Sequence, residues 1–165
     1  MGRPTTHTST VLNAHTQLSP FSCIPMAVEF VLKLLGRIPL DYFDLQQDWI
    51  NRPGGALGFN DFREFGGQTL YGVRFKAHYT PPVRGEAFPL EELFSVIDHE
   101  LASGRYVIIS LAVPGGWHNY VIHNRLSNAE YGAVTKAQNR EQITNVRQRV
   151  TDMRGTDILT YELID

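Results

Sequence analysis

Three residues combine types and positions suited to acyl-transfer chemistry: Cys23, His118 and Gln17. Cys23, the only cysteine, opens a segment with helical spacing, and the free N–H groups and dipole at a helix start favour thiolate over thiol. His118 follows a glycine turn at the start of a strand, and imidazole titrates in the range that a base for a thiol needs. The side-chain amide of Gln17 can donate to the negative oxygen of a tetrahedral intermediate.

Each of these residues also has a purely structural interpretation. A lone cysteine is often buried filler, and a glutamine at the position of Gln17 is often a surface residue. Strand alternation sends His118 and Tyr120 to one face, and Asn119 and His123 to the other. His118 and His123 therefore cannot serve the same site.

The helix that must position Cys23 is the clearest element of the sequence. Apolar residues recur at helical spacing over 23–35, with Ser22 as the expected N-cap and Gly36 as the stop. Glu29 and Lys33 are expected to form an exposed i,i+4 pair on this helix.

The remaining pattern predicts a sheet with helices set against it. The pattern over 41–80 predicts loop with short helices at 42–50 and 59–65. The elements predicted after it are a helix at 90–103, strands at 106–113 and 117–123, a turn at 124–129, a strand at 130–135, a helix at 140–153 and a strand at 158–164. Asn139 and Gln142 are placed like a capping box for the last helix. This order predicts an α+β fold with a mainly antiparallel sheet.

Composition restricts the remaining possibilities. The chain has 165 residues, 42% of them hydrophobic, and reads as a polar lead-in segment, 1–15, before a single domain, 16–165. A net charge of −2 without long charge runs gives no reason to expect nucleic acid as a partner. No apolar stretch is long enough to span a bilayer and no secretory signal is apparent, so we expect a soluble, cytoplasmic protein. The glycines and scattered histidines predict neither a cofactor nor a metal site.

The sequence resembles the papain-like cysteine peptidases at three motifs: Gln17, the run Ser22-Cys23-Ile24-Pro25 with the helix behind it, and the run from Trp117 to Ile122. Order and size are most similar to the bacteriocin-processing, double-glycine peptidase domains of bacteria and their stand-alone relatives. The resemblance covers the chain from about Thr16 onward. It implies a central N-terminal helix carrying Cys23 as nucleophile, packed on a sheet carrying His118 as base, with Gln17 as the oxyanion donor.

The sequence departs from that family at two positions. Ile24 stands where a glycine usually follows the cysteine, and the Asp-Pro pair expected after the strand that follows the histidine is missing. Folding the hairpin about 124–129 places Thr135 and Lys136 roughly opposite His118, and neither is a carboxylate. The third triad member is therefore open: Thr135, Gln138, Asn139, or none.

These residues predict a cysteine-dependent hydrolase, a thiol protease that cleaves a peptide or amide bond of a peptide or protein substrate through a thioester. A deamidase or acyltransferase with the same Cys-His pair is an alternative that the sequence does not separate. The other class of function is a catalytically impaired papain-like domain that binds peptides. Substrate and oligomeric state are not predicted.

Overall fold

The fold is taken from a computed structural model, which describes residues 5–20, 22–52, 62–79, 84–114, 116–127, 130–136 and 141–164, with the backbone alone for 5–8. The helices are α1 (Thr5–Ala14), α2 (Cys23–Leu34), α3 (Asp44–Ile50), the 3-10 turn η2 (Phe62–Glu64), α4 (Leu90–Ala102) and α5 (Val146–Met153). The strands are β1 (Thr69–Leu70), β2 (Val73–His78), β3 (Val107–Val113), β4 (Gly116–Ser127), β5 (Glu130–Val134), β6 (Gln142–Ile143) and β7 (Ile158–Leu163).

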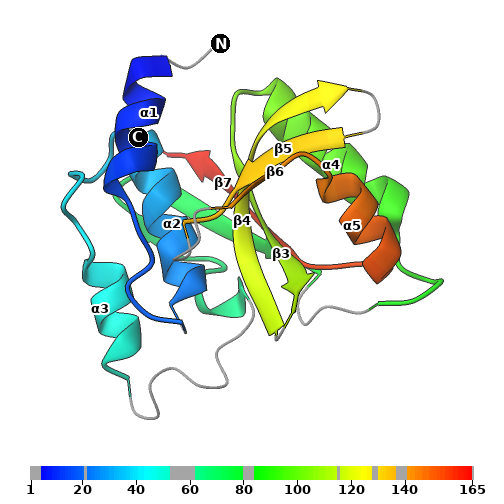
Figure 1. Ribbon diagram of the computed structural model, residues 1–165, viewed down its shortest axis with the longest axis horizontal. Coiled ribbons are helices and arrows are strands. Elements are labelled where there is room, and N and C mark those ends of the chain that lie inside the picture. The colour runs from blue at the N-terminus through cyan, green and yellow to red at the C-terminus, as the bar shows by residue number, and fades with distance from the viewer. Residues whose placement is uncertain are drawn as a thin grey trace.

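The described strands form one seven-stranded sheet in the order β1-β2-β7-β3-β4-β5-β6, and every pairing is antiparallel. Helices α1, α2 and α3 lie on one side of it and α4 and α5 on the other (Figure 1). The predicted α+β class with a mainly antiparallel sheet is confirmed. Each face of the sheet buries its own apolar cluster, one with α2 and one with α4 and α5.

Strand alternation decides which cluster each central residue joins. Val121 of β4 and Ile108 of β3 pack in the α2 cluster. Tyr120 of β4 and Leu111 of β3 pack in the cluster beneath α4 and α5. The ladder between β3 and β4 has no register shift from Val107↔Ile122 to Val113↔Gly116, so this division holds along the whole pairing.

Several predicted elements are corrected by the structure. The segment read as loop before residue 80 contains β1 and β2, and β2 pairs with β7 over its full length, a long-range pairing that local patterns do not indicate. The expected turn at 124–129 is shorter because β4 continues to Ser127. The last helix begins at Val146 rather than at residue 140, because Gln142 and Ile143 pair with β5 instead. The expected capping residue Asn139 lies outside the described residues.

Two further predictions for α2 need correction. Ser22 occupies the N-cap position, but its hydroxyl makes no cap hydrogen bond; it lies 3.0 Å from Ser19 O and 2.9 Å from Gln46 Oε1. Glu29 and Lys33 are not exposed, since both are almost fully buried. Both differences arise because α3 and the segment before α2 cover this side of the helix, which the helical pattern alone does not reveal.

We expect Gly155→Ala to destabilise the fold strongly. Gly155 has φ +129°, and an added Cβ would lie 2.6 Å from ring atoms of the buried Phe88. Backbone strain and overpacking together should lower the free energy of unfolding by about 2–4 kcal/mol in a denaturant titration. Gly104→Ala is the control, because Gly104 also has a positive φ but open space at its Cβ. Equal losses in the two variants would contradict the packing argument.

Candidate functional site around Cys23

The Cys23 thiol lies at the first residue of α2 and packs against the cluster on that face of the sheet. Burial raises its pKa from 9.0 to about 11, although N–H groups of Cys23, Ile24 and Asn119 directed at the sulfur lower it. The helix start thus acts in the expected direction, but desolvation has the larger effect. Cys23 is a protonated thiol at neutral pH.

Gln17 lies in the segment that leads to Cys23 and is only 6% exposed, so it is not a surface glutamine. Its backbone N–H donates to Lys136 O at 2.8 Å, just beyond the end of β5. Its side-chain Nε2 donates to Ser19 O at 2.7 Å, while Oε1 is buried and has no hydrogen-bond partner among the described residues. The amide stabilises its own loop, and one Nε2–H remains for another acceptor.

Gln46 of α3 holds this segment in place, a role that no local pattern in the sequence indicates. Its Oε1 accepts from Leu18 N at 2.7 Å, and its Nε2 donates to Thr16 O at 2.9 Å. The same Nε2 donates to Glu29 Oε1 on α2 at 2.8 Å. Gln46 therefore ties the residues on both sides of Gln17 to the helix that carries Cys23.

His118 lies on the other face of the sheet by strand alternation. It pairs with Leu111 across the β3–β4 ladder, and Leu111 belongs to the cluster beneath α4 and α5. Burial, Cys23, Ile24 and Asn119 account for the shifted thiol pKa, and His118 is not among these causes. The His118 Nδ1 is buried and has no hydrogen-bond partner among the described residues.

Asn119, rather than His118, lies on the face of the sheet that α2 covers. It is 3% exposed, its Nδ2 donates to Ser110 Oγ of β3 at 3.0 Å, and its backbone N–H is directed at the Cys23 sulfur. The residue that faces the thiol from β4 is therefore an amide and not an imidazole. The alternation predicted from sequence already separated Asn119 from His118, but the side of the sheet on which α2 packs was not predictable from it.

The residues considered for a third triad position are distributed as follows. Continuing the register of Val121↔Val134 by two residues places Lys136 opposite Asn119, which differs from the expected position opposite His118. Thr135 is buried, and its N–H donates to Glu141 O at 3.0 Å. Gln138 and Asn139 lie outside the described residues. The same continuation puts the position opposite His118 at residue 137, outside the described residues, so none of the three candidates is placed opposite His118.

Within the described residues there is no group of three or more His, Cys, Asp or Glu side chains that could hold a metal ion. In the same part of the chain no helix is long and apolar enough to cross a membrane. Comparison with protein-family models, curated proteins and solved structures gave no match to this chain.

Proposed function

We propose that this chain is a papain-like domain that binds a peptide or amide group beside Cys23 and has lost the Cys-His chemistry. The observation that carries the proposal is the β3–β4 register, which puts Asn119 on the α2 face and His118 on the opposite one. A thiol with a pKa near 11 and no imidazole beside it among the described residues is a poor nucleophile at neutral pH.

The groups near Cys23 are suited to recognising a carbonyl. The N–H groups of Cys23 and Ile24 at the start of α2 are donors directed at an uncharged thiol, and the remaining Nε2–H of Gln17 is a donor in the segment that leads to Cys23. Beyond Val121↔Val134, Asn119 N–H is directed at Cys23 and Lys136 O accepts from Gln17 N–H. These two contacts join the segment before α2 and the start of α2 to the ends of β4 and β5, which brings the donors of both segments to one junction.

The second candidate is the cysteine hydrolase in which His118 acts as base, with a deamidase or acyltransferase as variants of it. The observation that favours it is the position of Cys23 at a helix start, where the N–H groups of Cys23 and Ile24, together with that of Asn119 on β4, lower the thiol pKa against the effect of burial. Acyl transfer by this route requires His118 to reach the α2 face.

Alkylation of Cys23 by iodoacetamide, followed from pH 6 to pH 11, separates the two candidates. Because the pKa of the Cys23 thiol is near 11, the alkylation rate should rise across the whole range without a plateau below pH 9. His118→Ala should leave this pH profile unchanged. A plateau below pH 8.5 that disappears in His118→Ala would overturn the proposal and support the hydrolase.

Asn119→His gives the matched gain-of-function test, since it places an imidazole on the thiol's face of the sheet. We expect alkylation at pH 7 to become at least about tenfold faster, because an imidazolium beside the sulfur favours the thiolate. Asn119→Asp is the control, since a carboxylate there should slow the reaction. Mass spectrometry after incubation with a library of short peptide amides then reads the function: retained intact peptide supports binding, and cleaved products or a thioester on Cys23 support hydrolysis.

A further inference from the structure

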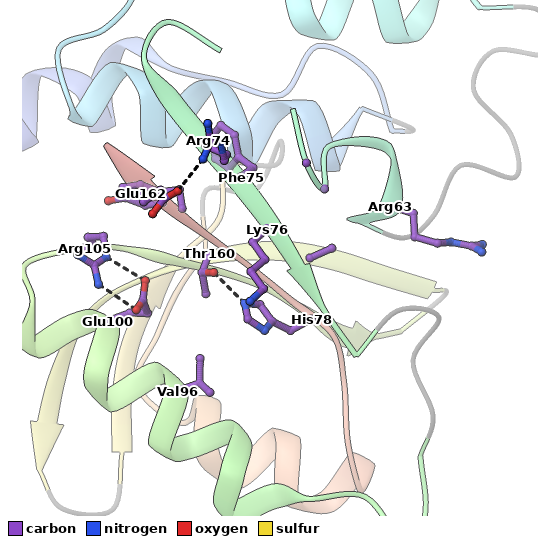
Figure 2. Close-up of a pocket in the computed structure, with 14 residues that line it drawn as sticks. Arg63, Arg74, Phe75, Lys76, His78, Val96, Glu100, Arg105, Thr160 and Glu162 are labelled. Atoms are coloured by element: carbon purple, nitrogen blue, oxygen red, sulfur yellow. Dashed lines mark hydrogen bonds and ion pairs between the residues drawn. The ribbon is translucent and has the colours of Figure 1, made fainter. Parts of the chain in front are cut away.

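A cavity of about 690 Å³ lies away from Cys23, between α4 and the neighbouring strands β2 and β7 (Figure 2). Alternation along β2 turns Lys76 and His78 away from the α2 cluster, to which Phe75 belongs. Thr160 of β7 lies directly opposite Lys76 in the ladder and lines the same cavity. The volume is in the range of pockets that hold small organic molecules.

The walls of this cavity carry more positive than negative charge. Its basic side chains are Arg63, Arg74, Lys76 and Arg105, and its acidic side chains are Glu100 and Glu162. Both acids are already paired: Glu100 accepts two hydrogen bonds from Arg105, at 2.9 and 3.0 Å, and Glu162 lies 3.1 Å from Arg74. These two pairs balance in charge, and Lys76 adds a positive charge to the cavity, which favours an anionic ligand.

Lys76 is the basic side chain best placed to contact a ligand. The chain has three lysines, and Lys33 and Lys136 are buried at 1% and 3% exposure, whereas Lys76 is exposed. Within the described residues Lys76 has no ion-pair partner. Its ammonium group is therefore available in the cavity.

His78 and Thr160 add hydrogen-bonding groups next to Lys76. His78 Nε2 lies 2.8 Å from Thr160 Oγ1, so the imidazole is fixed in orientation. Burial and the charge of Lys76 lower the pKa of His78 against the opposing charges of Glu100 and Glu92 on α4, and the lowered pKa keeps the imidazole neutral at pH 7. An anion bound between Lys76 and His78 would favour protonation of the imidazole, which couples binding to the uptake of one proton.

We propose that this cavity binds a small organic anion whose carboxylate or phosphate group contacts Lys76 and His78. Thr160 supplies a hydroxyl to the same group, and Val96 of α4 supplies apolar wall for the carbon skeleton. A point charge with a neighbouring imidazole recognises either kind of anionic group. The site is independent of Cys23, because it lies on β2, β7 and α4.

Calorimetric titration with succinate, citrate, inorganic phosphate and glycerol phosphate tests this proposal. We expect saturable binding of at least one organic probe, tighter at pH 6 than at pH 8, and about tenfold weaker in Lys76→Gln. Arg154→Gln is the control for net charge, because Arg154 is exposed and lies outside the cavity lining. It should bind the probes as the unchanged protein does.

Two further measurements make the assignment specific. A bound probe should protect Lys76 from acetic anhydride, read by mass spectrometry of the peptide that contains it, and His78→Gln should remove the difference between pH 6 and pH 8. Tighter binding of glycerol phosphate, or of succinate and citrate, shows whether the anionic group is a phosphate or a carboxylate. Either preference supports the site. Absence of saturable binding, or equal loss in Lys76→Gln and Arg154→Gln, would overturn the proposal.

Discussion

Glu29→Ala should lower the free energy of unfolding by about 3–5 kcal/mol. The Glu29 carboxylate is fully buried and accepts three hydrogen bonds, from Leu45 N at 2.9 Å, Gln46 N at 3.2 Å and Gln46 Nε2 at 2.8 Å. Alanine would leave these donors buried without an acceptor and would also leave a cavity. The change should be visible as a large shift of the midpoint in urea-induced unfolding.

The consequence should extend to the Cys23 site. Gln46 links Glu29 to Leu18 and Thr16. Without the Glu29 carboxylate the Gln46 side chain is no longer held in one orientation, and the segment that contains Gln17 should loosen. Faster amide exchange at Gln17 in Glu29→Ala would report this effect. Glu86→Ala is the control, because the Glu86 side chain is 93% exposed and its change should stay within about 0.5 kcal/mol. Equal unfolding midpoints for the two variants would contradict the role assigned to Glu29.

The second large effect is expected from His15 at acid pH. Its imidazole is fully buried and stacks on Phe30 and Phe43; Nε2 lies 2.8 Å from Met26 O, and Nδ1 lies 2.9 Å from Lys33 Nζ. Burial, followed by the charge of Lys33, lowers the pKa of His15 from 6.5 to about 3. Between these values the unfolded chain binds a proton that the folded chain does not, so His15 makes stability fall as the pH falls.

Glu29 opposes this trend over part of the range. Burial raises its pKa from 4.5 to about 7, so between these values the folded chain binds a proton that the unfolded chain does not, and stability rises as the pH falls. The two contributions therefore offset each other between about pH 6.5 and 4.5. Below pH 4.5 the loss due to His15 remains, down to about pH 3.

Unfolding free energies measured from pH 7 to pH 3 test this account. His15→Gln should be destabilised by a few kcal/mol at pH 7, and the difference from the unchanged protein should shrink as the pH falls towards 3. Glu29→Gln removes the opposing contribution, so its stability should decline from about pH 6.5 onward. Parallel curves for His15→Gln and the unchanged protein would contradict the buried neutral imidazole.

The buried group around His15 also explains why Lys33 tolerates its position. Lys33 Nζ donates to Leu40 O at 2.8 Å and lies 3.7 Å from the centre of the Phe43 ring. Burial lowers its pKa from 10.5 to about 8, partly offset by the charge of Glu29. Glu29 and Lys33, at i and i+4 of α2, thus make tertiary contacts and do not face solvent, although their spacing fits either arrangement.

The sequence by itself determined the elements whose signals are local. The helix starting at Cys23, the helix after Pro89, the β3–β4 hairpin and the last strand follow from periodicity, glycine and proline, and the α+β class follows from their order. The separation of His118 from Asn119 also follows from the sequence, because successive residues of a strand point to opposite faces.

Only the tertiary structure decided which of those faces meets Cys23. Local spacing does not specify on which side of the sheet α2 packs, and this choice gives Asn119 and not His118 the position beside the thiol. Long-range pairing likewise placed β2 beside β7 in the sheet. Packing against α3 and the segment before α2 buried Glu29 and Lys33. The three predicted site residues are thereby divided: Cys23 and Gln17 lie at one junction, and His118 lies across the sheet from them.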